Sequence, residues 1–107
     1  MGEQREAYFR IDKSNISGCG TFATKKVRNN VEIGCAFMII GSNGIQDKDI
    51  TSTELGALTN HSSEPNLLIK RDGNKYIYVA RRDIEKDEEL TVDYSEIGFD
   101  GKKDFNI

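Results

Sequence analysis

Several residue types are scarce or missing in this sequence. It has no tryptophan, one proline, one histidine and two cysteines among 107 residues. Cys19 and Cys35 lack the Cys-x-x-Cys spacing of a metal site. We therefore expect free thiols in a reducing compartment and no bound metal.

Long apolar runs and a secretion signal are also missing. The longest apolar stretch, around residues 36–40, is far too short to cross a bilayer. Residues 2–10 are mostly polar and do not form the charged and then apolar pattern of a signal peptide. We expect a soluble protein with no membrane contact, located in the cytoplasm.

A strong excess of one charge is absent as well. The chain has 15 basic and 18 acidic residues, a net charge of −3. This balance argues against a phosphate-binding surface, so we expect no direct contact with nucleic acid. Acidic residues do gather in residues 83–93, where Lys86 is the only basic residue. That run is either a solvated turn or a patch that attracts a basic peptide.

The chain length and the spacing of apolar runs indicate one mainly β domain over residues 1–107. Short apolar runs alternate with turn residues, as in proteins built from many short strands. We expect a turn at residues 41–44. The expected strands cover residues 8–11, 20–23, 31–33, 37–40, 67–70, 75–80 and 90–94.

Two local features can be predicted in more detail. Thr51 and Glu54 have the spacing of a capping box, which predicts one short helix through Leu55 and Leu58, weakened by Gly56. The Asp72-Gly73 dipeptide predicts a tight hairpin between residues 67–70 and 75–80. In its second strand, Tyr76 and Tyr78 share one face, which we expect to be aromatic and partly wet.

Three short motifs carry the functional signal. Residues 18–23 read Gly-Cys-Gly-Thr-Phe-Ala, residues 60–66 read Asn-His-Ser-Ser-Glu-Pro-Asn, and residues 88–94 read Glu-Glu-Leu-Thr-Val-Asp-Tyr. Each has a purely structural explanation: the glycines can shape a hairpin, His61 can satisfy a buried carbonyl, and Tyr94 can be a core ring. In this order and spacing, within residues 17–94, the motifs resemble the SET domain of protein lysine methyltransferases.

The resemblance implies a fold and an activity. SET domains are mainly β, β-clip-like assemblies of several small curved sheets, and a C-terminal pseudoknot would bring the Asn60 loop beside Tyr94. The implied activity is transfer of a methyl group from S-adenosylmethionine to a lysine amine of a protein. Tyr94 matches the catalytic tyrosine that orients the amine. The residues matching cofactor contacts are Gly18, Cys19, Gly20, Asn60, His61 and Tyr94.

The sequence departs from the family pattern in the lysine channel. Phe37 stands where many members have a second channel tyrosine, so a hydroxyl is missing there. Val92 stands where many members place a Phe or Tyr that limits the number of methyl groups. The smaller side chain leaves room for two or three methyl groups, unless Tyr76 or Tyr78 enters the channel.

The C-terminal tail, residues 95–107, lacks the cysteines of the zinc segment found in many members. Phe99 or Phe105 could instead pack on the adenine ring, or a partner subunit of a homodimer could close the cleft. In its brevity the chain resembles viral and bacterial SET proteins. This would place it in a host-cell cytoplasm, or in the nucleus for a eukaryotic virus.

A second hypothesis is a non-enzymatic β-rich module that keeps the SET architecture and binds a peptide. Phe37 and the short C-terminus favour the module. The intact Asn60, His61 and Tyr94 favour the enzyme, whose substrate would be a protein or peptide with a lysine in a basic segment.

Overall fold

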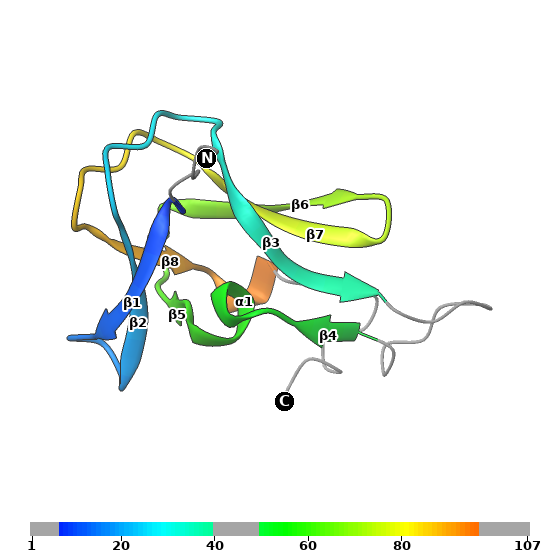
Figure 1. The fold of residues 1–107 in the computed structure, drawn as a ribbon, viewed down its shortest axis with the longest axis horizontal. Coiled ribbons are helices and arrows are strands. Elements are labelled where there is room, and N and C mark those ends of the chain that lie inside the picture. The colour runs from blue at the N-terminus through cyan, green and yellow to red at the C-terminus, as the bar shows by residue number, and fades with distance from the viewer. Residues whose placement is uncertain (1–6, 40–49, 97–107) are drawn as a thin grey trace, which may run out of the picture.

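The computed structural model describes residues 7–39 and 50–96. Strands dominate these residues, together with one short helix, as the mainly β prediction required (Figure 1). The elements are β1 (Phe9–Lys13), β2 (Cys19–Ala23), β3 (Glu32–Ile39), β4 (Ile50–Ser52), α1 (Glu54–Leu58), β5 (Asn60–His61), β6 (Leu67–Asp72), β7 (Lys75–Ala80), β8 (Glu89–Val92) and a 3-10 turn, η2 (Tyr94–Glu96).

The first sheet has the strand order β1-β2-β8-β5. Strand β8 is antiparallel to β2 and parallel to β5, with Asn60 opposite Thr91 and His61 opposite Val92. The last strand of the chain therefore lies between two earlier ones. This pairing brings the Asn60 loop next to the segment that leads to Tyr94, as the resemblance implied.

The second sheet has the order β4-β3-β7-β6, and all of its pairs are antiparallel. Sequence patterns predicted two strands at residues 31–33 and 37–40, but β3 is continuous. Two register shifts, between Glu32 and Gly34 and between Cys35 and Phe37, interrupt its pairing with β7. Such bulges bend a strand without ending it. The turn expected at residues 41–44 lies outside the described residues.

The β6–β7 hairpin has its turn one residue later than predicted. Asp72 pairs with Lys75, so the loop consists of Gly73 and Asn74. Gly73 has φ +64°, a conformation that glycine adopts without steric penalty. Asp72 remains paired with Lys75 in the sheet. The Asp72-Gly73 dipeptide therefore predicted the hairpin correctly but placed its turn one residue too early.

Helix α1 begins after Thr53, and the prediction that Thr51 caps it was wrong. The Thr53 side chain accepts a hydrogen bond from Gly56 N at 3.2 Å and donates one to Cys35 O at 2.7 Å. Thr51 lies in β4, where it pairs with Met38. The pairing of β4 with β3 holds Thr51 in extended backbone, so the cap falls two residues later.

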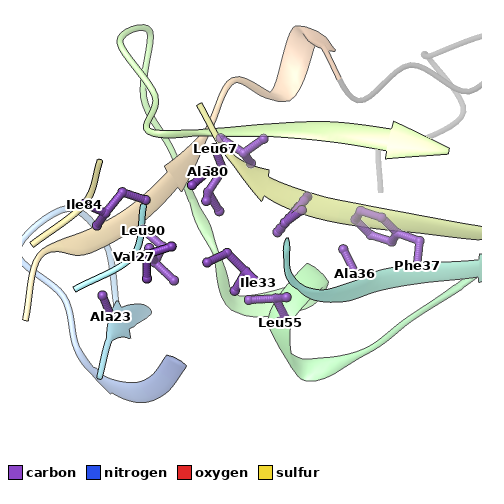
Figure 2. Close-up of a cluster of buried hydrophobic side chains, with 12 residues drawn as sticks. Ala23, Val27, Ile33, Ala36, Phe37, Leu55, Leu67, Ala80, Ile84 and Leu90 are labelled. Atoms are coloured by element: carbon purple, nitrogen blue, oxygen red, sulfur yellow. The ribbon is translucent and has the colours of Figure 1, made fainter. Parts of the chain in front are cut away.

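The core lies where the two sheets meet (Figure 2). One group of side chains comes from the second sheet and α1, and the other comes from β2, β8 and the bridge between Val27 and Ile84. The buried cluster consists of Ala23, Val27, Ile33, Ala36, Phe37, Leu55, Leu67, Tyr78, Ala80, Ile84, Leu90 and Val92. One continuous cluster thus joins the two sheets.

The expectation of a partly wet aromatic face on β7 was wrong for Tyr78. Residues 77–80 are all buried, and Tyr78 is 0% exposed. The strand lies between β3 and β6, and its Tyr78 side faces the core cluster. Tyr76, nearer the hairpin turn, is half-buried.

Two features are not found in residues 7–39 and 50–96. No helix there is long and apolar enough to span a membrane. No group of three or more His, Cys, Asp or Glu side chains lies close enough together there to hold a metal ion. Cys19 and Cys35 are free thiols.

Candidate functional site

The Asn60 side chain connects the three motifs. Its Nδ2 lies 3.1 Å from Ser17 O, 3.2 Å from Cys19 O and 3.0 Å from Glu89 Oε2. Ser14 Oγ is a fourth acceptor at 3.0 Å. An amide group has only two donor hydrogens, so the four acceptors share them. Asn60 thereby holds the Gly-Cys-Gly turn against the start of β8.

Ser14 and Glu89 complete this clamp, and sequence reasoning missed both roles. The Ser14 hydroxyl lies 2.8 and 3.0 Å from the two carboxylate oxygens of Glu89. It also accepts hydrogen bonds from the backbone N–H groups of Ile16 and Ser17. Ser14 was recognisable as a turn residue, but nothing in the sequence indicated which distant side chain it contacts. We call Ser14, Asn60 and Glu89 the polar clamp.

The two glycines of the first motif have different surroundings. A Cβ atom on Gly20 would overlap the Glu89 carboxylate and lie 3.1 Å from Asn60 Nδ2. Gly20 is therefore required by the polar clamp. Gly18 has φ +45°, and a Cβ there would meet nothing within 4 Å. Its backbone faces open space, which a ligand could occupy.

His61 and Tyr94 contact each other, although they lie 33 positions apart in the chain. His61 Nδ1 accepts a hydrogen bond from Tyr94 N at 3.1 Å, and the ring centroids are 5.0 Å apart at a 50° tilt. Because Nδ1 is the acceptor, the proton of the neutral imidazole is on Nε2. Asp93 Oδ1 lies 3.9 Å from Nδ1. Hydrogen bonds from Ser95 lower the pKa of the Asp93 carboxyl.

Tyr94 is not part of the last strand, in contrast to the prediction of a strand over residues 90–94. Strand β8 ends at Val92, and Ser95 N donates to Asp93 Oδ1 at 2.9 Å, which begins the η2 turn. The Tyr94 ring leaves the sheet and is 52% exposed. Its hydroxyl donates to Thr59 O at 3.2 Å, and partial burial raises its pKa.

Thr59 is a second residue that sequence reasoning missed. It is buried at the C-terminus of α1, where its hydroxyl donates to Leu55 O at 2.7 Å. Thr21 Oγ1 lies 2.7 Å from Thr59 Oγ1. The carbonyl that accepts from Tyr94 is thus fixed by both α1 and β2. No short-range pattern in the sequence signalled this role.

The last residue of the second motif, Asn66, has a structural role. It is buried; its Oδ1 accepts from Thr91 N at 2.8 Å, and its Nδ2 donates to Glu89 O at 2.9 Å. These two bonds replace backbone pairing along β8. Asn66 therefore anchors the Asn60 loop to the strand before Tyr94.

The four predicted channel residues are divided between the core and the surface. Phe37 and Tyr78 are buried together, with ring centroids 6.1 Å apart and an interplanar angle of 82°. Val92 is buried in the same cluster. The Tyr76 hydroxyl instead accepts a hydrogen bond from Arg71 Nη1 at 3.3 Å near the hairpin turn.

The Tyr78 hydroxyl differs from the other buried polar groups. Within residues 7–39 and 50–96 it is the only buried side-chain oxygen or nitrogen without a hydrogen-bond partner. Burial raises the pKa of the Tyr78 hydroxyl, and at alkaline pH the Tyr94 phenolate raises it further. An unsatisfied buried hydroxyl costs about 1–3 kcal/mol of stability.

Three carboxylates of the acidic run at residues 83–93 pair with arginine or lysine side chains. Arg10 contacts Asp87 at 2.9 Å, and Lys26 contacts Glu85 at 3.5 Å. Glu88 Oε2 lies 2.5 Å from Arg82 Nη2, and this hydrogen bond is the main reason why the pKa of the Glu88 carboxyl is lowered. These contacts favour the solvated-turn interpretation over an unpaired patch that attracts a basic peptide. Phe99, the last predicted cofactor contact, lies outside the described residues.

The family model of the SET domain matches residues 6–95. The chain belongs to the SET domain family.

Relatives at the sequence level are fungal. The Saccharomyces cerevisiae protein named Potential protein lysine methyltransferase SET6 is 47% identical over 36 residues, which cover 34% of this SET domain and 10% of that protein. An Emericella nidulans protein named Histone-lysine N-methyltransferase, H3 lysine-4 specific, is 50% identical over 52 residues, covering 42% of this chain and 4% of that protein. The matches thus span a tenth or less of these curated relatives.

Solved structures support the fold. A candidate histone methyltransferase from Plasmodium falciparum has a TM-score of 0.64 at 22% identity, covering 84% of this SET domain and 95% of that chain. The methyltransferase domain of human PR domain-containing protein 2 has a TM-score of 0.62 at 17% identity, covering 82% of this chain and 77% of that one. The SET fold predicted from the motifs is confirmed.

Proposed function

We propose that this SET domain catalyses S-adenosylmethionine-dependent methylation of a lysine side chain in a protein. The observation that carries the proposal is the contact between His61 and Tyr94 beside the polar clamp, because it unites all three motifs at one place. The names of the fungal relatives support the same activity, since they are lysine methyltransferases.

The residues around the Gly-Cys-Gly turn suit the cofactor of the family. Gly18 has open space beside its backbone, Cys19 is exposed, and His61 is nearly half exposed. We assign the cofactor to this turn, to Asn60 and His61 and to the adjacent Tyr94. The side chain of Asn60 already binds the turn, so its part is to hold the Cys19 carbonyl in place. When bound, S-adenosylmethionine supplies an electrophilic methyl group on sulfur.

Tyr94 orients the lysine amine rather than deprotonating it. A free lysine has a pKa of about 10.4, and the amine must lose its proton before it can accept a methyl group. Burial in apolar surroundings lowers the pKa of an amine and so favours the neutral form. The same desolvation raises the pKa of Tyr94, which therefore stays a neutral hydroxyl at pH 7. It donates to Thr59 O and can accept a hydrogen bond from the amine.

The substrate and its setting are further parts of this proposal. We infer that the substrate is a protein segment that presents a lysine and that the protein acts in the cytoplasm. A partner subunit of a homodimer is the alternative to the C-terminal tail as the wall of the cleft. Val92 leaves room for a second and a third methyl group in the channel, unless Tyr76 or Tyr78 enters it. The relatives reported above are fungal, so they lend no support to a viral or bacterial source.

The first test is a calorimetric titration of S-adenosylmethionine into the purified protein. Wild type and Ser63→Ala should bind equally, because Ser63 is an exposed residue of the same loop. His61→Ala should bind about tenfold more weakly, since it loses the contact with Tyr94 N, and a tenfold change corresponds to about 1.4 kcal/mol.

Tyr94→Phe separates binding from transfer. It should keep most of the cofactor affinity but lose about a hundredfold in methyl incorporation, because misplaced reactants lose rate on this scale. No binding by the wild type at millimolar cofactor would reject the enzyme. The peptide-binding module, favoured by the missing hydroxyl at Phe37, would then be the better hypothesis.

A further inference from the structure

We propose that the carboxylate of Glu89 makes the cofactor site prefer a positively charged sulfonium over a neutral thioether, so that S-adenosylmethionine is favoured over its demethylated product. The inference rests on the proposed function and names a specificity-determining residue for the same site. Glu89 acts through the charge that it holds against the Gly-Cys-Gly turn, and it forms no covalent bond.

The first observation is that the charge of Glu89 has no basic partner. The Ser14 hydroxyl lies 2.8 and 3.0 Å from its two oxygens, and Asn60 Nδ2 lies 3.0 Å from Oε2. Both of these side chains are neutral. Within the part of the chain that the structure describes, no lysine, arginine or histidine forms an ion pair with Glu89, whereas the preceding Glu88 pairs with Arg82. Neutral donors stabilise a carboxylate but leave its negative charge uncompensated.

The second observation is the place of this carboxylate. A Cβ atom on Gly20 would overlap Glu89 Oε2, so the carboxylate lies against the backbone of the turn. Asn60 Nδ2 also joins it to the carbonyl oxygen of Cys19. Gly18, at the other end of the same turn, has open space beside its backbone. The uncompensated charge is therefore next to the segment to which we assign the cofactor.

The third observation is the partial burial of Glu89. It is half-buried at the start of β8, where it pairs with Phe22 of β2. The side chain of Glu85, by comparison, is 71% exposed and contacts Lys26. Water and salt screen a half-buried charge less than an exposed one. The field of Glu89 should therefore act on a ligand at the turn more strongly than the field of Glu85.

The sulfur atom of the ligand responds to such a field. In S-adenosylmethionine the sulfur is bonded to three carbons and carries a positive charge. When the neutral lysine nitrogen takes the methyl group, the electron pair of the broken sulfur–carbon bond stays on sulfur and the positive charge passes to nitrogen. The product, S-adenosylhomocysteine, is a neutral thioether whose amino and carboxylate groups are unchanged. A carboxylate at the turn thus distinguishes the two ligands by the charge on sulfur.

The experiment compares Glu89→Gln with Glu85→Gln, which is the same substitution at an exposed position outside the polar clamp. Calorimetric titrations with S-adenosylmethionine and with S-adenosylhomocysteine give two dissociation constants for each protein, and their ratio is the readout. Ser14→Ala is the third variant, because it removes a hydrogen bond of the clamp and keeps the charge. Urea unfolding shows whether each variant is folded.

In Glu89→Gln the affinity for S-adenosylmethionine should fall about three- to tenfold more than the affinity for S-adenosylhomocysteine, as expected for one partly screened pair of charges. Glu85→Gln should keep the wild-type ratio. Ser14→Ala should weaken the binding of both ligands by the same factor, since it loosens the turn without changing its charge.

Equal losses for the two ligands in Glu89→Gln would overturn the inference, because Glu89 would then act on the turn through its shape alone. An equal change of the ratio in Glu85→Gln would also overturn it, since the net charge of the protein would be the cause.

The wild type provides a test that remains if Glu89→Gln does not fold. Its preference for S-adenosylmethionine should decrease as salt is added, and a ratio independent of salt would overturn the inference. A wild type that binds neither ligand would instead reject the proposed function, and the role of Glu89 with it.

Discussion

At the scale of single residues, Gly20 shows how one missing side chain permits a polar cluster. The Glu89 carboxylate and the Asn60 amide occupy the space where a Cβ on residue 20 would lie. The Gly-x-Gly pattern was predicted to contact the cofactor through its backbone. The structure adds a second reason for glycine at this position, the close approach of two polar side chains from β5 and β8.

This close approach predicts non-additive stability changes. Gly20→Ala should push the Glu89 carboxylate away from Ser14 and Asn60 and lower the unfolding free energy by about 1–3 kcal/mol, as for lost buried hydrogen bonds. Glu89→Ala alone should lose the same contacts. In the double variant the added methyl group has room. The decrease in unfolding free energy of the double variant should therefore be smaller than the sum of the decreases in the two single variants. Urea unfolding of the four proteins measures the coupling, and strictly additive losses would contradict it.

At the scale of elements, α1 is set by packing against β3 more than by helix propensity. The capping-box spacing predicted a helix at this place, and a helix is there. Its start at Glu54, after the N-cap Thr53, depends on the pairing of β4 with β3, which residues 51–58 alone do not indicate. Gly56 would weaken an isolated helix, but a Cβ there would overlap Ala36 O.

Helix propensity and packing therefore make opposite predictions for Gly56→Ala. Propensity alone favours alanine by about 1 kcal/mol. The overlap with a backbone oxygen should outweigh it, since overpacking costs about 1–3 kcal/mol, so we expect a lower unfolding free energy. The control is Ala57→Gly at the exposed neighbouring position, which should lose about 0.5–1 kcal/mol through propensity alone. A more stable Gly56→Ala protein in urea unfolding would contradict the close packing of α1 on β3.

At the scale of the whole molecule, raised and lowered pKa values define a pH range of full stability. The pKa of Tyr78 lies above its ordinary value of 10.0, chiefly through burial, so the folded protein holds a proton that the unfolded chain releases above pH 10. The contribution of Tyr78 to the unfolding free energy is fully present below pH 10 and is lost as the pH rises further. The pKa of Glu88 lies below its ordinary value of 4.5, chiefly through Arg82, so its contribution is present above that pH and is lost in acid.

Urea midpoints measured from pH 3 to pH 11 should therefore show a plateau with a decline at each end. Tyr78→Phe should flatten the alkaline decline, and Glu88→Gln should flatten the acid one. Glu88 is partly exposed, so the acid decline that it causes should be smaller than the alkaline decline caused by Tyr78, and it should weaken as salt is added. An alkaline decline that is unchanged in Tyr78→Phe would show that other groups cause it.

Much of the fold could be predicted from local patterns, and the errors have common physical causes. The hairpin, the short helix and most strands were expected near their observed positions. The errors concerned Thr51, the turn at Gly73 and the end of β8, where pairing with a distant strand decides the last residue of an element. The buried environment of Tyr78 was missed because period-two alternation tells which residues share a face but not what covers it.

The sequence by itself determined the family, because three ordered motifs within residues 17–94 are a specific combination. It also determined the residue types available for chemistry, among them one histidine and no metal-ligand cluster in the expected spacing. Only the tertiary structure decided which of these residues meet. His61 and Tyr94, Asn60 and Glu89, and Phe37 and Tyr78 are each brought together by strand pairing and core packing, and contacts between distant segments leave no local pattern in a chain.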